Sequence, residues 1–540
     1  MATPARQEPG GDRASGADSG GATRADRAAS QAAGPPVATL DLEHDAIGLP
    51  GVLFQSATSM APAAAIAASI PLGAAFAAGA LPLSVLLAFV GILFTAWSIG
   101  QLARHIPAAG SVATYSAAGI APWVGFLVGW GYAAMQVLVL PLVMLQLGFS
   151  VAGTWHSEQS SFPTGAWWVF TVAGTVLVCW LVYRGVRTST RTGVVLGTIE
   201  IAIFLGLSIA LVIKAGSANT LSVFTTHHAN APGYAGMSGV VAGGVGVLLA
   251  FAGFESAAAL AEETRHPRRN VQRAIMYATV IIGALYVFTT YAATVAYGPN
   301  RFAGFASASN GVPWDGLARG LQSALWLFVL LAIINSTLAC ANANTNVFTH
   351  TAYAFGRIGV FPRWFADLHP RFRSPRVGVV VELLIGLAVT LALGFKYTPE
   401  VAFGIVGTAI VVVIVPIYIL ANFVCIAYFA RNRATAGFNW LSHVVVPVIG
   451  AAILVPGFMS VAGITGVPGL RFITALTSPY KYAPYVMAGW MVVGVAVLLV
   501  LRARRPESIK AVSEIHLDET PTDVTHGAQA IEPAAEGEAA

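Results

Sequence analysis

The sequence predicts an all-α protein that crosses a membrane about twelve times. Of its 540 residues, 56% are hydrophobic and only 10% are charged, whereas soluble domains contain about 25% charged residues. No Asp, Glu, Lys or Arg occurs between Asp45 and Arg104 or between Lys214 and Glu255. A membrane-spanning helix needs about 20 apolar residues, so the longest uncharged stretches have room for two spans. This composition excludes an ordinary soluble domain.

The spans follow one another with short connections. A Gly/Pro turn at residues 79–82 separates the first two, and the segment that holds Lys396 and Glu400 separates the ninth from the tenth. The predicted span centres lie near residues 62, 92, 135, 175, 203, 248, 286, 335, 386, 414, 451 and 492.

Basic residues are unevenly distributed over the connecting loops, and this distribution predicts the orientation. With the N-terminus inside, inner loops hold 15 Lys and Arg residues and outer loops hold 6. Cytoplasmic loops carry such an excess. The protein is therefore expected in the plasma membrane with both termini in the cytoplasm. Because the basic residues lie in short loops between spans, no nucleic-acid partner is expected. The inner residues are Arg104, Arg184, Arg187, Arg191, Arg265, Arg268, Arg269, Arg273, Arg357, Arg363, Arg371, Arg373, Arg376, Arg431 and Arg433, and the outer ones are Lys214, Arg301, Arg319, Lys396, Arg471 and Lys481.

The two ends of the chain differ in composition from the apolar part. Residues 1–45 are rich in Ala, Gly, Asp and Arg and lack the apolar core of a secretory signal. Residues 506–540 form an acidic tail. Both segments are expected to be disordered cytoplasmic tails that flank a membrane domain at residues 46–505.

Two spans contain features that interrupt a helix. The first holds three hydroxyl residues and a proline at residues 56–62, and proline removes a backbone donor and clashes with the preceding turn. The sixth holds Ala252, Gly253 and Phe254, where glycine permits irregular dihedral angles. If spans one to five and six to ten are inverted repeats, the breaks match and indicate a binding site near the middle of the membrane. Simple kinks are the alternative.

Glu255 directly follows the second break, and the nearest preceding charge is Lys214. A carboxylate inside a membrane costs at least a few kcal/mol and marks a functional site by default. The outer half of the first span is expected to begin near Pro62 with free N–H groups, and the outer half of the sixth to end near Phe251 with free carbonyls. The free N–H groups suit a carboxylate, and the free carbonyls suit an ammonium group. An amino acid would use both helix ends, whereas a polyamine or amino alcohol would use one.

Other polar residues within the spans have two interpretations each. Glu200 in the fifth span is either a coupling group or structural. His350 near the end of the eighth is either a proton carrier or a packed histidine. Tyr132 and Gln136 share a face of the third span, where they either line the pocket or bond neighbouring helices. Glu382 in the ninth is expected to pair near the cytoplasmic interface.

No cofactor or metal site is expected. Cys179, Cys340 and Cys425 fall in separate apolar spans and are interpreted as small buried hydrophobic residues. The adjacent His227 and His228 lack further ligands for a metal. The sequence shows no hydrolase triad and no phosphate-binding Walker loop, so neither an enzyme nor an ATP-driven pump is expected.

Four blocks of the sequence resemble the amino acid–polyamine–organocation (APC) superfamily of permeases. The resemblance covers about residues 45–505 and implies a core of five plus five helices in inverted repeats, with discontinuous first and sixth helices and two additional C-terminal helices. It also implies secondary transport of amino acids or related amines. The blocks are FAGFESAAALAEETRHPRRNVQRAI at 251–275, HIPAAGSVATYSAAGIAPWVGFLVGW at 105–130, AYAFGRIGVFPRWFADLHPRFRSPRVGV at 352–379 and ILANFVCIAYFARNR at 419–433.

The resemblance also implies where a substrate binds. Three departures from the superfamily pattern affect shape and coupling: the Gly-rich first break is SATSMAP, a basic residue of the fifth helix is Glu200, and an Arg of the eighth is His350. A proton is the expected coupling ion, through Glu255, Glu200 or His350, with sodium coupling or exchange left open. The residues that match the unwound first helix are Ser56, Ala57, Thr58 and Ser59, followed by Met60, and those that match the unwound sixth helix and its aromatic gate are Phe251, Ala252, Gly253 and Phe254.

A secondary permease in a lipid bilayer is therefore the leading hypothesis. The alternative is a membrane-embedded sensor or accessory subunit that has the same fold and does not transport. The expected partner is a small amino acid or amine, and the sequence leaves the oligomeric state open.

Overall fold

The computed structural model describes residues 47–506 and 509, apart from residues 109, 186–189, 262, 358 and 373. The side chains of Thr190 and Arg191 are also outside the description. The predicted tails at 1–45 and 506–540 lie outside the described residues, except for Pro506 and Ile509, and so do the loop residues Arg187 and Arg373.

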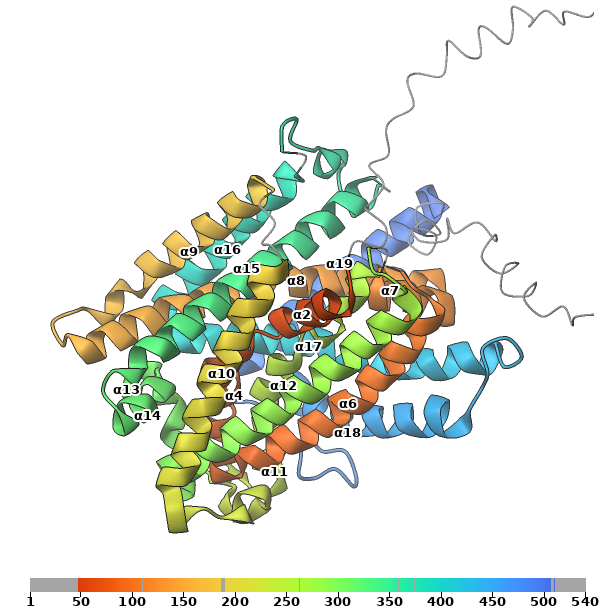
Figure 1. Ribbon diagram of the computed structural model, residues 1–540. Coiled ribbons are helices and arrows are strands. Elements are labelled where there is room, and N and C mark those ends of the chain that lie inside the picture. Colours follow the sequence, from red (N-terminus) through yellow and green to blue (C-terminus); the bar gives the residue numbers. More distant parts are fainter. Residues whose placement is uncertain are drawn as a thin grey trace, which may run out of the picture. The chain divides into compact units, whose positions relative to one another are not determined.

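Helices make up most of the described chain (Figure 1). Eleven segments within it are long and apolar enough to cross a membrane. All twelve predicted span centres fall inside these segments, because Leu49–His105 is 57 residues long and contains the first two. The expectation of an all-α polytopic membrane protein is confirmed.

The first half of the chain includes a small antiparallel hairpin in the loop before α11. Short 3₁₀ and π helices are labelled η. The elements are α2 (Leu49–Ser59), α3 (Pro62–Ala64), η1 (Ala65–Ser69), α4 (Ile70–Leu72), α5 (Ala74–Ala77), η2 (Ala78–Ala80), α6 (Leu81–His105), α7 (Ser111–Gly119), α8 (Pro122–Glu158), η3 (Thr164–Ala166), α9 (Trp167–Tyr183), α10 (Thr190–Ala215), η4 (Gly216–Ala218), η5 (Leu221–Phe224), η6 (Thr226–His228), β1 (Asn230–Ala231) and β2 (Tyr234–Ala235).

The second half begins with the broken sixth span. Its elements are α11 (Met237–Phe251), η7 (Phe254–Leu260), α12 (Pro267–Tyr297), η8 (Pro299–Ser307), α13 (Ala308–Gly311), α14 (Pro313–Leu321), α15 (Leu325–Arg357), η9 (Arg363–Ala366), α16 (Arg376–Lys396), α17 (Pro399–Arg431), η10 (Leu441–Val445), α18 (Val446–Ala462), η11 (Tyr480–Tyr482) and α19 (Ala483–Arg504).

Helix α8 is surrounded by other helices of the fold. It packs against α9, α15, α16 and α17, while α6 packs against α12 and α18 on another side. Figure 1 shows α9, α15 and α16 side by side. Because α8 is enclosed in this way, its mid-helix polar side chains Gln136, Gln146 and Ser150 are buried in the protein.

The first span breaks at Met60 and Ala61. Helix α2 ends at Ser59, Ala61 has φ 46° and ψ 66°, and α3 begins at Pro62. A residue before proline is disfavoured in the helical region because the proline ring crowds it. The expectation that residues 56–59 are unwound is wrong, because the proline affects only the residues next to it. The backbone up to Ser59 is helical, and the N–H of Met60 still bonds the Ser56 carbonyl at 3.1 Å.

The second break lies at Ala252 and Gly253, as predicted. Ala252 leaves the helix with ψ 129°, and Gly253 has φ 102°, a conformation that favours glycine. A Cβ atom added to Gly253 would lie 2.8 Å from the Cβ of Ser59. The missing side chain therefore permits the two breaks to touch.

Small residues hold the outer halves of the two broken spans together. Helix α11 packs against η1, α4 and α5. A Cβ atom on Gly246 would clash with the Ser69 carbonyl oxygen, and one on Gly73 would clash with the Gly243 carbonyl oxygen. Close backbone approach over small residues is a common basis of helix association in membranes.

We predict that Gly246→Ala lowers the stability of the protein, whereas Gly244→Ala does not. Overpacking of a tight contact costs about 1–3 kcal/mol. The matched position Gly244 has no neighbouring atom within 4 Å of an added Cβ, so alanine there is neutral or stabilising through its higher helix propensity. Melting temperatures in detergent measure both variants. Equal melting temperatures would contradict the close packing of α11 against the first span.

Candidate functional site

The two breaks border a small cavity of about 40 Å³. Liquid water occupies about 30 Å³ per molecule, and ligand pockets measure about 300–1,000 Å³. An organic ligand therefore needs more space than this cavity offers. The lining residues are Ser59, Met60, Ala61, Ala64, Ala65 and Ser69 of the first span, Met135, Val139, Leu142, Val143 and Gln146 of α8, Leu249, Ala250, Ala252 and Gly253 of the sixth span, Cys340 and Asn344 of α15, and Ile410 of α17.

The cavity includes part of the predicted site. Because a helix turns by about 100° per residue, only the last residue of α2, Ser59, reaches the cavity. The predicted residues that line it are Ser59, Met60, Ala252 and Gly253, and those outside the lining are Ser56, Ala57, Thr58, Phe251, Phe254, Tyr132 and Gln136.

Sequence reasoning missed the amide side chains Gln146 and Asn344. The position of Gln146 could have been inferred from its spacing in the sequence. It belongs to a set of five α8 residues at helical spacing, which share one face of the helix and line the cavity. Asn344 lies between Asn342 and Asn346 in the sequence. Only the orientation of α15 in the fold determines that Asn344, and not its two neighbours, reaches the cavity. The five residues on α8 are Met135, Val139, Leu142, Val143 and Gln146.

Both amides donate from nitrogen to backbone carbonyls. Gln146 Nε2 donates to the Ala64 carbonyl at 2.7 Å, and Asn344 Nδ2 donates to the Cys340 carbonyl at 2.9 Å. Their side-chain oxygens can accept hydrogen bonds from a ligand, and the second N–H of Gln146 can donate one. The cavity thereby presents both acceptors and a donor.

Hydroxyl groups connect the first span to the sixth. Ser56 Oγ donates to the Phe254 carbonyl at 2.7 Å and accepts from the Ala257 N–H at 3.0 Å. The Tyr286 hydroxyl lies 3.1 Å from the carbonyl oxygens of both Met60 and Ala250. These bonds satisfy backbone groups that the breaks free, so Ser56 links the two spans and does not face a ligand.

Glu255 lies at the start of η7 and is fully buried. The Tyr132 hydroxyl donates to its Oε1 at 3.1 Å, and the Tyr418 hydroxyl donates to its Oε2 at 2.7 Å. The backbone N–H of Gly253 donates to the Tyr418 hydroxyl at 3.4 Å. This cluster joins α8, α17 and the sixth span just beyond the second break, and it gives the predicted residue Tyr132 a position next to the cavity.

Glu200 lies between α10, α15 and the start of α3. Asn335 Nδ2 donates to its Oε2 at 3.0 Å, and Ser336 Oγ donates to its Oε1 at 3.3 Å. These two bonds join α10 to α15.

Two other titratable residues lie away from the cavity. His350 is exposed on α15, ten residues or about 15 Å along the helix from the cavity residue Cys340. Glu382 is fully buried and accepts a hydrogen bond from Thr345 Oγ1 at 3.1 Å. The expected pairing of Glu382 near the interface is wrong, because the α16 helix turns its side chain into the protein.

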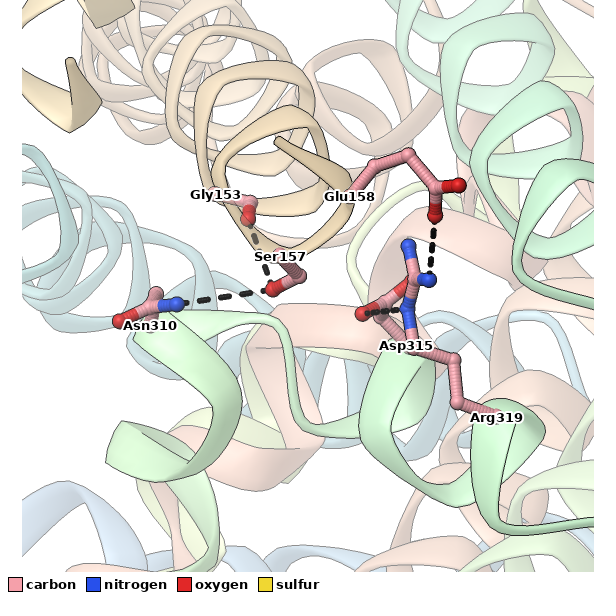
Figure 2. A network of polar contacts seen from close by, with 6 residues as sticks. All are labelled: Gly153, Ser157, Glu158, Asn310, Asp315 and Arg319. Atoms are coloured by element: carbon pink, nitrogen blue, oxygen red, sulfur yellow. Dashed lines mark hydrogen bonds and ion pairs between the residues drawn. The ribbon is translucent and has the colours of Figure 1, made fainter. Parts of the chain in front are cut away.

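Helix α14 covers the outer half of the first span. Its buried Trp314 donates from Nε1 to the Ile66 carbonyl at 2.8 Å. Figure 2 shows Arg319 of the same helix between Glu158, at 2.6 Å, and Asp315, at 2.9 Å. Burial raises the pKa of Asp315, and the hydrogen bond and charge of Arg319 act in the opposite direction.

A second contact lies beside this ion pair. The Asn310 amide lies 3.5 Å from Ser157 Oγ at the end of α8 (Figure 2). The two contacts join the segment around α13 and α14 to the end of α8.

Comparison with known proteins identifies several with similar sequences. The low-affinity putrescine importer PlaP of Escherichia coli K12 is 28% identical over 354 residues, which cover 64% of this chain and 74% of that protein. The branched-chain amino acid permease BcaP of Bacillus subtilis is 25% identical over 344 residues, which cover 59% and 70%. A general amino-acid permease of Candida albicans is 27% identical over 331 residues, which cover 58% and 54%.

A family model confirms the resemblance seen in the sequence. The model of the amino acid permease family matches residues 51–505, which is most of the chain and includes both helix breaks. The relatives are transporters by name. The chain therefore belongs to the amino acid permease family of the APC superfamily.

Proposed function

We propose that the protein is a secondary transporter that moves amino acids or related amines across the cytoplasmic membrane by alternating access. The observation that carries the proposal is the meeting of two broken helices at a small cavity. Broken helices free backbone donors and acceptors at mid-membrane depth, where they bind small polar solutes. A core of five plus five helices in inverted repeats, with two further helices after it, accommodates both breaks at equivalent positions.

We propose that a transport cycle breaks two sets of contacts in turn. On one side the Glu255 carboxylate joins Tyr132 and Tyr418. On the other, α14 is held by Trp314 and Arg319. Opening one set at a time would expose the cavity to one side of the membrane at a time, which is alternating access.

The substrate class is an amino acid or a related amine. The named relatives include a putrescine importer and a branched-chain amino acid permease, and the cavity lies between a helix start and a helix end that suit charged groups. Proton-coupled symport or exchange is the proposed mode, because Glu200 and Glu255 are carboxyl groups buried beside the breaks. No observation favours the alternative of a sensor or accessory subunit.

Uptake in proteoliposomes tests the proposal. Radiolabelled amino acids, polyamines and amino alcohols are supplied with and without proton and sodium gradients. We expect accumulation of at least one compound, driven by a proton gradient or by exchange. Binding without any flux of the bound compound would favour a sensor.

We predict that both termini are cytoplasmic. The basic residues of the loops support this orientation by the positive-inside rule. Single cysteines in the loops at residues 214–234 and 363–376 are treated with an impermeant thiol reagent on intact cells. The first loop should be labelled and the second protected until the membrane is permeabilised. The reverse pattern would invert the topology.

We predict that Glu255→Gln loses gradient-driven uptake or its pH dependence but still binds substrate. Glutamine retains much of the hydrogen bonding to Tyr132 and Tyr418 but has no carboxyl group to titrate. Counterflow exchange and pH profiles of uptake measure the effect.

Tyr132→Phe is the matched control, because it removes one hydrogen bond to Glu255 and retains the titratable group. The control should retain pH-dependent uptake. A Glu255→Gln variant with the full pH dependence of the wild type would reduce Glu255 to a helix cap, and coupling would then be assigned to Glu200 or His350.

A further inference from the structure

The side of the bundle where α6 and α12 pack together contains an open groove of about 470 Å³ (Figure 1). This volume is typical of a small-molecule site, and the groove shares no lining residue with the cavity at the helix breaks. All of its lining residues are apolar or aromatic, so it suits an apolar ligand. They are Leu86 and Phe89 of α6, Leu221 and Phe224 of η5, and Ala284, Val287, Phe288 and Tyr291 of α12.

The groove continues a stripe of exposed apolar side chains along α12. Tyr277, Val280 and Ile281 precede the groove at helical spacing, so they share a face with its residues, and they are between 42% and 51% exposed. Because α12 is long and apolar enough to span the membrane, this face contacts lipid. From Tyr277 to Tyr291 the stripe runs about 21 Å along the helix, which is less than the roughly 30 Å thickness of the hydrocarbon layer.

One end of the groove is polar. The Tyr291 hydroxyl donates to Asn219 Oδ1 at 3.2 Å. The hydroxyl oxygens of Thr220 and Ser222 lie 2.8 Å apart, on either side of the wall residue Leu221 in the chain. These groups belong to the loop after α10 and to the last turns of α12, so this end lies toward a membrane surface. An apolar groove with a polar end at the surface has the pattern of a membrane lipid.

Aromatic contacts hold the walls of the groove in place. Phe224 stacks on Tyr291 with the ring centroids 5.8 Å apart. Phe89 stacks on Phe251 at 6.2 Å and lies against Gly283, where an added Cβ atom would clash with its ring. Side chains that are fixed before a ligand arrives lose little conformational freedom on binding, so the groove is preorganised.

We propose that the groove binds one acyl chain of a membrane phospholipid, with the lipid head group at the loop of residues 216–228. The chain covers Leu221, which is 74% exposed. Because the surrounding lipid is equally apolar, the stabilisation comes from close packing and not from the hydrophobic effect. A preformed hollow surrounds a chain with more atoms than a ridged helix surface does, and each such contact adds dispersion attraction.

Photocrosslinking tests where the chain lies. The delipidated full-length protein in detergent is titrated with a phospholipid that carries a diazirine in one acyl chain, and labelled peptides are mapped by mass spectrometry. We expect labelling of residues 221–224 and 284–291 to saturate at low lipid concentration. Labelling of the lipid-facing side of α19 should rise in proportion to the lipid, because that side offers only ordinary lipid contact. Its exposed apolar residues include Val486, Val492 and Leu499.

Variants assign the binding to the groove. Ala284→Trp fills the groove from α12 and should reduce phospholipid retention in native mass spectra about tenfold, because the indole occupies the space of the chain. Ile281→Trp is the matched control: it places the same indole on the same exposed stripe, at a position that does not line the groove. The control should retain lipid as the wild type does.

A second variant guards against an effect of Ala284→Trp on folding. Leu221→Ser removes an exposed apolar side chain from the loop wall without adding bulk, so the helices remain packed as before. It should also reduce the retention of phospholipid, and melting temperatures in detergent show that each variant is folded.

Several results would overturn the proposal. Labelling that rises in proportion to lipid at the groove as well as at α19 would mean ordinary lipid contact only. Unchanged lipid retention in both Ala284→Trp and Leu221→Ser would place the chain elsewhere. A change of oligomeric state in Ala284→Trp without loss of lipid would make the groove a contact between two copies of the protein. None of these results depends on transport, so the lipid site and the proposed function fail separately.

Discussion

The direct contact between the two helix breaks is the constraint on which the site depends. Gly253 has room for no side chain because Ser59 lies against it, and the same position needs a positive φ that favours glycine. Glycine is the residue type that both lacks a side chain and readily adopts a positive φ. The superfamily pattern places glycines in the first break, whereas here Ala61 adopts a positive φ there. The close approach thus depends on the glycine of the sixth span and on the small residues that pack α11 against the first span.

Breaking two helices inside a membrane frees backbone groups that water does not reach, and the structure satisfies them from several helices. Ser56, Tyr286, Gln146 and Trp314 each bond a backbone carbonyl of a broken span. An unsatisfied group at this depth would cost several kcal/mol. These side chains come from the first, seventh and third spans and from α14, so the breaks are stabilised by the assembled fold. Movement of any of these helices changes which backbone groups are paired, and this couples the cavity to the arrangement of the bundle.

The buried carboxylates follow a different principle. Glu200 and Glu255 are surrounded by neutral donors, so each charge is spread over several hydrogen bonds and remains uncompensated by a cation. Such an arrangement costs folding free energy and is retained where a charge has a function. It also means that a cationic ligand or a proton changes the local charge balance more than it would in a site that already contains an ion pair.

The sequence by itself determined the apolar spans, the second break, the proline that ends the first break and the family. Hydrophobic runs have to match the thickness of a bilayer, proline disfavours a helical conformation in the residue before it, and glycine permits dihedral angles that other residues avoid; all three effects are local in the chain. The fold decided which residues meet at the cavity. Gln146 reaches Ala64 across 82 residues, and Asn335 reaches Glu200 across 135. Ser56, Tyr132 and Gln136 have the same polar character but fall outside the lining. Helix rotation and packing select among equally polar side chains, and these depend on contacts between distant segments that local pattern does not encode.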